Sequence, residues 1–328
     1  MRLPRSSSRG RSERASHDST KASSSVTLKQ LASELSTALV PLIGARRVLE
    51  NFGEEKVLVD ATNKFLIRDD AGKTEFVVLC SAAGGPGIVA RGVQRARETV
   101  DVLGEALGRV VLLPVAEGNL DGRTFAIYPY CTPLLESGLG GWLQGSIVRP
   151  RVARWLVEAS RRTVLEVPED ELERRVCSPL EKLTADDGHS PALSELADEA
   201  LRATRAGSWQ PRYVFMHGDL WVGNVLINQR SAGGSRFGRF VIIDWAGSRL
   251  RGCPMYDFLR LAISFRWEGR AFVRALDQYC AALGYTRTEG GYAFASAAAE
   301  LGQSREQWPR SSYLTTIDCC YRKLKSAG

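Results

Sequence analysis

Three polar side chains suited to phosphate chemistry follow one another at the ends of short apolar runs. Asp219 lies in the run HGDLWVGNVL at 217–226, and Asn224 follows it five residues later. Asp244 comes directly after the apolar run FVII at 240–243. Because the ends of neighbouring strands meet in loops, the pattern predicts that two carboxylates and one amide lie together. Phosphoryl transfer requires such a set: a carboxylate that orients the acceptor hydroxyl, and hard oxygen ligands for Mg²⁺.

The same residues also have an ordinary structural explanation. An aspartate followed five residues later by an asparagine is common, and Asp244 after an apolar strand is also what a turn residue looks like. The conjunction is much rarer, because it combines a histidine, an aspartate, an asparagine and a second aspartate behind a strand-rich segment. We therefore prefer the interpretation that these residues form a phosphoryl-transfer site.

The motif H-x-D-x-x-x-x-N, followed by an apolar run and a second Asp, resembles the signature of the small-molecule phosphotransferases with a protein-kinase-like fold. These include the aminoglycoside phosphotransferases, choline kinases and fructosamine kinases, and H-G-D-L-W-x-G-N is most similar to the fructosamine kinases. The resemblance implies that Asp219 is the catalytic carboxylate and that Asn224 and Asp244 are magnesium ligands. It also implies that His217 braces the loop, rather than acting as a base, and that Asp257 supports it from the following helix.

The resemblance further implies an α+β, two-lobed protein-kinase-like fold with a small antiparallel-sheet N-lobe and a larger, mainly helical C-lobe. We expect a disordered basic Ser/Arg-rich tail over 1–25, a nucleotide-binding lobe over 26–130, and a catalytic and acceptor-binding lobe over 131–328. The implied reaction is ATP- and Mg²⁺-dependent phosphorylation of a hydroxyl on a small molecule, a sugar or amino-sugar derivative. The alternative is a catalytically weak nucleotide-binding or scaffold protein with the same fold.

Two parts of the family's nucleotide site are missing, which motivates that alternative. The turn VDATNKF at 59–65 contains no glycine, and only Asn63 fits the family pattern there. The third strand carries Leu79 and Cys80 where the family has its phosphate-binding lysine. Positioning of ATP for transfer nevertheless requires a cation near the phosphates.

Lys64 on the second strand is the best substitute for the missing lysine, since one branch of protein kinases carries its lysine on this strand. An ordinary surface lysine is the alternative. Glu98 matches the glutamate that normally pairs with the family's lysine, and it equally matches a solvated helix carboxylate beside a neighbouring arginine. The resemblance also places the backbone of Tyr130 and Cys131 at the adenine edge.

The surrounding sequence predicts the elements that position these residues. Leucines at three- and four-residue spacings predict an amphipathic helix over 26–43. Residues 55–130 read as strands 56–59, 64–68, 75–80, 109–114 and 123–130, with a helix over 89–107. A Gly-rich linker is expected over 132–145. Beyond it we expect helices over 151–165, 191–206, 255–267, 270–283, 292–301 and 311–324, and strands over 213–216, 225–227 and 239–243.

The composition limits which classes of partner and which cellular compartment are expected for the protein. The 328 residues are 44% hydrophobic and 25% charged, as in globular proteins. The net charge is +7, but residues 1–30 hold seven basic and two acidic side chains, so the rest carries only +2. That distribution argues against a nucleic-acid partner. Seven cysteines without a C-x-x-C pair indicate free thiols in a reducing cytoplasm, and no apolar run is long enough for a membrane span.

The acceptor side is expected among the helices after residue 255. Arginines and carboxylates are mixed over 260–328, which argues against a strongly cationic acceptor. Trp245 and Trp267 have the ring faces to stack on a sugar or a quaternary amine, although tryptophans at such positions are more often core residues.

Overall fold

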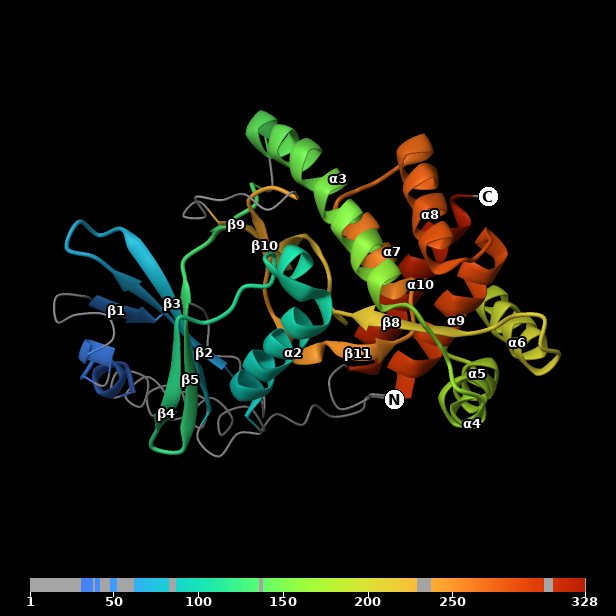
Figure 1. Cartoon of the computed structure of the whole chain (residues 1–328), viewed down its shortest axis with the longest axis horizontal. Helices are drawn as coiled ribbons and strands as arrows, with labels where there is room; N and C mark the ends of the chain where they lie inside the picture. The colour runs from blue at the N-terminus through green and yellow to red at the C-terminus, as the bar shows by residue number, and fades with distance from the viewer. Residues whose placement is uncertain are drawn as a thin grey trace, which may run out of the picture. The chain divides into compact units, whose positions relative to one another are not determined.

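The computed structural model describes residues 31–37, 39–41, 48–51, 62–82, 87–135, 138–228, 237–303 and 309–327. The chain divides into two compact units, one comprising 1–90 with 114–130 and the other 91–113 with 131–328. Figure 1 colours the elements by their order in the chain. The predicted tail over 1–25 and the predicted strand over 56–59 lie outside the described residues.

The first unit contains a five-stranded antiparallel sheet with strand order β1-β2-β3-β5-β4. Asp69 closes the predicted hairpin between the second and third strands, because its Oδ1 accepts hydrogen bonds from the backbone N–H groups of Ala71 and Lys73. The strands are β1 (Val48–Asn51), β2 (Thr62–Arg68), β3 (Thr74–Ser81), β4 (Ala116–Leu120) and β5 (Arg123–Pro129).

One face of this sheet is buried against the helical residues 31–37 and 39–41. Phe65 and Ile67 of β2 belong to the same apolar cluster as Leu31, Leu35 and Leu39, which confirms the amphipathic helix expected from the leucine spacing. Side chains alternate along a strand, so Lys64 and Leu66 lie on the opposite face of the sheet.

Helix α2 (Ile88–Gly108) was predicted, but its contacts place residues 91–108 in the second unit rather than in the N-terminal lobe. The carbonyl of Leu107 accepts a hydrogen bond of 2.9 Å from the indole Nε1 of Trp155, which is fully buried. The strand predicted over 109–114 is wrong. Val111 forms only a single parallel bridge to Ile242, because the backbone here bonds to the second unit instead of the sheet.

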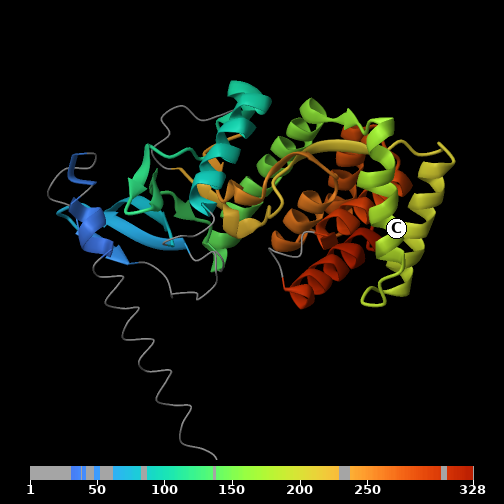
Figure 2. The same ribbon diagram turned by 90° about the horizontal axis from the view of Figure 1, so that it is seen from below.

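The second unit is mainly helical, as Figure 2 shows. The helices predicted after residue 190 are confirmed, whereas α4 and α5 carried no clear periodicity and were not predicted. The helices are α3 (Gly138–Thr163), α4 (Glu169–Leu172), α5 (Ser178–Thr184), α6 (Pro191–Arg205), α7 (Tyr256–Ser264), α8 (Gly269–Leu283), α9 (Arg287–Gln303) and α10 (Arg310–Lys325).

The linker expected over 132–145 is largely structured. β6 (Thr132–Pro133) pairs with β9 (Val225–Ile227), and α3 begins at Gly138. Glycines there lower the helix propensity, but the same helix buries Val148, Val152 and Trp155 in the core, and this packing outweighs the local cost.

Short strands frame the loops of interest in this unit. β10 (Phe240–Ile242) and β9 form a three-stranded sheet with β6. β8 (Arg212–Met216) lies between β11 (Arg249–Gly252) and β7 (Leu165–Glu166) in another. Across the described residues, no helix combines the length and the hydropathy needed to cross a membrane.

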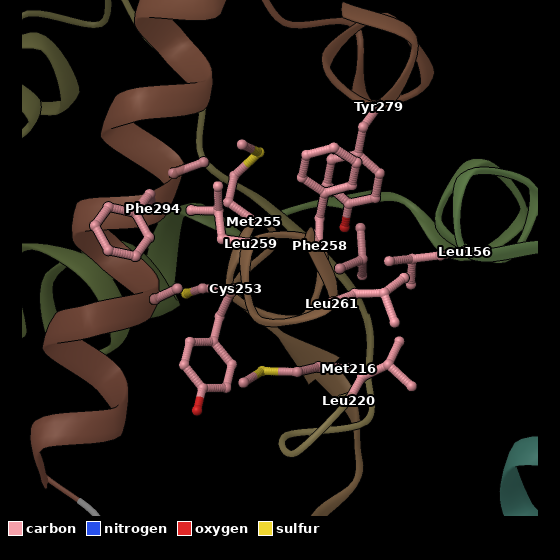
Figure 3. Close-up of a cluster of buried hydrophobic side chains, with 14 of the residues drawn as sticks. Leu156, Met216, Leu220, Cys253, Met255, Phe258, Leu259, Leu261, Tyr279 and Phe294 are labelled. Carbon is pink, nitrogen blue, oxygen red and sulfur yellow. The ribbon is translucent and has the colours of Figure 1, made fainter. Parts of the chain in front are cut away.

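Helix α7 runs through the apolar core of the second unit (Figure 3). Phe258, Leu259 and Leu261 are fully buried, and the Phe258 ring stacks on Tyr279 of α8 with centroids 4.9 Å apart. Trp245 and Trp267 are also buried, so the core alternative holds for both tryptophans. The core therefore fixes the position of α7, which matters because its polar residues contact the loop that carries Asp219.

Candidate active site

The backbone brings Asp219, Asn224 and Asp244 into one cluster at the end of the β9–β10 pair. The N–H of Ile243 donates to the carbonyl of Asn224 at 3.0 Å, so Asp244 is the next residue beyond this pairing. The Asn224 Nδ2 donates to the Asp219 carbonyl at 2.8 Å and lies 3.3 Å from the Asp219 Oδ2. Asp219 and Asn224 are therefore in direct contact, and the backbone places Asp244 next to the residue that pairs with Asn224, while the approach of the Asp244 carboxylate to the other two side chains stays a prediction.

His217 uses both of its ring nitrogens within the loop. Nε2 lies 3.0 Å from the carbonyl oxygen of Ile243, which can only accept, and Nδ1 lies 3.3 Å from the donating N–H of Asp219. The ring is fully buried and packs edge-on against Trp245, with centroids 4.6 Å apart. These contacts connect the Asp219 loop to the residue before Asp244 and leave neither nitrogen available as a base.

Asp257 holds the start of the same loop from α7. Its carboxylate accepts from the backbone N–H of His217 at 2.5 Å and from that of Gly218 at 3.1 Å, and it is almost completely buried. Burial raises the pKa of Asp257, while the neighbouring His217 and the backbone donors oppose this rise by favouring the charged form. The carboxylate thus replaces water as the partner of otherwise unpaired backbone N–H groups.

Two further residues of α7 contact the loop, and sequence reasoning did not assign either to it. Arg260 donates from Nη2 to the Asp219 Oδ1 at 2.8 Å. The Ser264 Oγ accepts from the N–H of Val222 at 3.0 Å. With Asp257 they lie at positions i, i+3 and i+7, which is one stripe of a helix. A polar stripe at this spacing in the apolar segment YDFLRLAIS was the signal available in the sequence.

Asp244 combines exposure with an unusual backbone conformation. Its φ of 65° and ψ of 63° lie in the left-handed region, which costs a non-glycine residue about 1–2 kcal/mol. Its side chain is exposed, and the described residues provide it with no hydrogen bond or ion pair. The protein therefore maintains a mildly strained backbone that presents a carboxylate to solvent, a pattern that is typical of functional positions.

Asn224 and Asp244 fit a magnesium site. Both present hard oxygen donors, and the Nδ2 contacts of Asn224 direct its Oδ1 away from Asp219. Within the described ranges there is no cluster of three or more His, Cys, Asp or Glu side chains able to enclose a metal. A cation here would complete its shell with water and phosphate oxygens, as Mg²⁺ commonly does in phosphoryl-transfer proteins.

The side chains predicted to contact the nucleotide lie on one strand of the sheet and on a separate helix. Lys64 is exposed on β2, directly opposite Leu79 of β3, and Asn63 is opposite Cys80. Glu98 pairs on its own helix with Arg95 at 2.9 Å, in agreement with the solvated-carboxylate alternative. Lys64 therefore lies on the same face of the sheet as Leu79 and directly beside it, and Leu79 is one of the two positions where the family's lysine was expected.

The structure restricts the contact predicted for the segment after β5. The N–H of Tyr130 already donates to the carbonyl of Glu75 at 2.8 Å, so it cannot serve as a purine donor without breaking that bond. Cys131 is buried, and its role at an adenine edge stays a prediction.

Gly218 permits the close approach of the Asp219 loop to the segment after Asp244. Its φ is +86°, and a Cβ there would lie 2.8 Å from the backbone oxygen of Gly247. We predict that Gly218→Ala lowers the free energy of unfolding by about 3 kcal/mol, since both the backbone conformation and a rigid neighbour oppose the methyl group. Thermal or urea unfolding measures this effect.

Gly207→Ala is the matched control for this substitution. Gly207 has a similar φ of +67°, but a Cβ would meet nothing within 4 Å. Only the conformational cost applies there, about 1 kcal/mol. Equal destabilisation by the two substitutions would show that the contact between the Gly218 and Gly247 segments is not rigid.

The chain is similar to known proteins of solved structure. Solved structures that are similar include the GDP complex of aminoglycoside 2'-phosphotransferase-IIIa, with 16% identity, a TM-score of 0.53, and coverage of 90% of this chain and 99% of that chain. Choline kinase LicA from Streptococcus pneumoniae shows 13% identity and a TM-score of 0.47, with coverage of 90% and 99%. No curated protein sequence gives a significant match.

The first of these two similarities supports the kinase-like, two-lobed α+β fold implied by the sequence motif. The sequence pattern of the phosphotransferase enzyme family matches residues 55–296, which is most of the chain and includes the whole Asp219, Asn224 and Asp244 cluster. The chain therefore belongs to the phosphotransferase enzyme family.

Proposed function

We propose that the protein transfers the γ-phosphoryl group of ATP to a hydroxyl of a small molecule, a sugar or an amino-sugar derivative, in a Mg²⁺-dependent reaction. The observation that carries this proposal is the cluster of Asp219, Asn224 and Asp244, held by α7 and by His217. Membership of the phosphotransferase family supports the reaction class. The seven free thiols fit action in a reducing cytoplasm.

In this proposal each polar residue of the cluster has one task. Asp219 accepts a hydrogen bond from the acceptor hydroxyl and orients its oxygen towards the γ-phosphorus. The new O–P bond forms as the bond to the β–γ bridging oxygen breaks, ADP leaves, and the hydroxyl proton passes to Asp219 and then to water. Asn224 and Asp244 would hold Mg²⁺, and the ion would neutralise charge on the phosphate oxygens.

We assign nucleotide binding to the first unit together with the carbonyl of Tyr130 and the backbone of Cys131, and catalysis and acceptor binding to the second unit. Lys64 supplies the cation for the phosphates. The register supports this role, because Lys64 and Leu79 form a directly opposed pair with Cβ atoms about 5 Å apart on the same face of the sheet. Asn63, which lies in β2 opposite Cys80, is assigned to the phosphate side of the nucleotide site. Glu98 is not assigned to this site, because it pairs with Arg95 on its own helix.

Replacing Lys64 by methionine tests this assignment. We expect Lys64→Met to raise the KM for ATP about 10- to 100-fold, the usual range for the loss of one contact between a charged group and phosphate. Steady-state kinetics measures the change. Lys73→Met, in the exposed hairpin turn of the same sheet, is the control and leaves the KM for ATP unchanged.

A rescue variant makes the test sharper. Leu79→Lys in the Lys64→Met background moves the ammonium group across the strand pair to the family's usual position, and it should restore most of the ATP affinity. If Lys64→Met binds ATP normally, Lys64 is an ordinary surface lysine and another residue contacts the phosphates.

The scaffold alternative is favoured by two observations, the absence of a lysine at Leu79 and Cys80 and the absence of a glycine from residues 59–65. Two measurements on the full chain separate the alternatives. Titration of Mg²⁺ and ATP in a thermal-shift assay raises the Tm if the native state binds the nucleotide. ADP release with a panel of sugars and amino sugars then reports turnover. Stabilisation without turnover supports a scaffold. The absence of both stabilisation and turnover rejects the proposed kinase.

A further inference from the structure

Arg260 forms an ion pair with the proposed catalytic carboxylate. Its Nη2 lies 2.8 Å from the Asp219 Oδ1, and the side chains of Arg260 and Asp219 are 26% and 39% exposed. Burial lowers the pKa of Arg260, but Tyr256 and the hydrogen bond to Asp219 raise it and give a net increase. The guanidinium is therefore charged, partly desolvated, and in direct contact with the group that would orient the acceptor.

This pair differs from the ion pairs on the outer surface of the second unit. Arg202 and Asp198 of α6, for example, are 70% and 48% exposed and lie one helical turn apart. Such pairs contribute little to stability. Arg260 instead connects a helix fixed by the core to a loop 41 residues earlier in the chain, at the position between the Asp257 and Ser264 contacts. A connection at that position has the geometry to fix a carboxylate.

We propose that Arg260 is a positioning and specificity-determining residue, which fixes the Asp219 carboxylate for the acceptor hydroxyl and disfavours acceptors that carry an ammonium group beside that hydroxyl. The inference rests on the proposed function and names the substrate class for it. Oδ1 is held by Arg260 at 2.8 Å, whereas Oδ2 has only the longer contact of 3.3 Å with the Asn224 Nδ2, so the acceptor hydroxyl is directed to Oδ2. A cation bound next to that hydroxyl lies within a few ångströms of the guanidinium and is repelled.

An exposed aromatic ring two residues from Asp219 and the pairing of acidic side chains elsewhere in the second unit favour an uncharged acceptor. Trp221 is 40% exposed, and its ring covers Gly223, where a Cβ would overlap it. The exposed ring offers an apolar surface for the carbon face of a sugar. Two acidic side chains of the C-terminal helices that could attract a polycation are instead paired with arginines, Glu300 with Arg249 and Asp277 with Arg287. We therefore assign neutral sugars and N-acylated amino sugars as the acceptor class.

Matched acceptor pairs test this inference on the full chain. Each pair has the same hydroxyls and differs only in a charged or acylated nitrogen, as in glucosamine and N-acetylglucosamine. We expect the wild type to favour the neutral member by about tenfold or more in kcat/KM. Arg260→Gln should lower kcat for the neutral member about tenfold with an unchanged KM for ATP, and should remove most of the discrimination. Arg260→Lys keeps the discrimination, because it keeps the charge.

The controls separate a positioning role from general damage to the fold. Arg202→Gln, on the outer face of α6, leaves both kcat and discrimination unchanged. Thermal unfolding of the Arg260→Gln and Arg260→Lys variants checks that loss of rate does not follow loss of Tm. Discrimination that persists in Arg260→Gln, or a wild type that turns over only the ammonium members, overturns the inference.

A second measurement tests the role of Arg260 if none of the chosen acceptors is phosphorylated. ATP hydrolysis then reports the reaction with water as acceptor, and Arg260→Gln should lower its kcat about tenfold without changing the KM for ATP. An unchanged kcat rejects the positioning role while leaving the kinase proposal intact. A wild type that neither binds nor hydrolyses ATP rejects the proposed function itself, and the role of Arg260 with it.

Discussion

Asp219→Asn should reduce kcat by about 10²- to 10⁴-fold and leave the KM for ATP nearly unchanged. The amide has nearly the same shape as the carboxylate, but it cannot take the proton of the acceptor hydroxyl, and a positioned proton acceptor contributes a factor of this size. The substitution also removes one partner of the 2.8 Å pair with Arg260. Initial rates of ADP release at saturating ATP measure the effect, and the Tm establishes that the variant is folded.

Asp277→Asn is the matched control for that experiment. Asp277 also forms an ion pair with an arginine, Arg287, but both residues are exposed and lie on α8 and α9. Its loss should leave kcat unchanged. A variant Asp219→Asn with the wild-type rate would mean that another group orients the acceptor, and the whole assignment of the loop would be wrong.

Asp244→Asn should reduce kcat/KM by at least about 10²-fold and shift the dependence on Mg²⁺ to higher concentrations. A metal that neutralises phosphate charge lowers the activation barrier by several kcal/mol, and loss of a charged ligand removes much of this stabilisation. Asparagine tolerates the left-handed conformation that Asp244 adopts, with φ of 65°, so the fold is preserved. Rates measured across a Mg²⁺ titration report the change.

Asp244→Gly is the companion variant, because glycine adopts the same conformation without strain and removes the side chain entirely. It should lose activity as Asp244→Asn does and retain the wild-type Tm. Asp244→Ala is a poor choice, since a methyl side chain adds conformational strain to the loss of the ligand. Wild-type rates at every Mg²⁺ concentration in both variants would show that Asp244 is an ordinary turn residue and not a metal ligand.

The spacing of the sequence motif predicted how the backbone places Asn224 and Asp244, because this spacing determines local structure. Asn224 directly precedes β9 and Asp244 follows β10, and the antiparallel pairing of these short apolar strands brings their backbones together. The predicted hairpin of β2 and β3 likewise contains its own turn signal at Asp69. Local chemistry of this kind can be read from a single chain.

Contacts between distant segments could not be read in that way. The pair of Arg260 and Asp219 depends on how α7 is placed in the core, which no local pattern specifies. Residues 109–113 have strand composition, but Val110 and Leu112 bond to Ile242, more than a hundred residues later, and the segment forms no strand of the sheet. The glycines at the start of α3 indicate a linker locally, whereas packing further along the helix keeps them helical.

Transfer of label from [γ-³²P]ATP to a small molecule tests the central claim most directly. The wild type and Asp219→Asn are each incubated with ATP, Mg²⁺ and a set of neutral sugars, N-acylated amino sugars and amino sugars, and the labelled products are separated by chromatography. We predict a labelled sugar phosphate that requires both Mg²⁺ and the Asp219 carboxylate. Equal labelling by Asp219→Asn, or no labelled product and no hydrolysis of ATP by the wild type, would contradict the assignment of this protein as a small-molecule kinase.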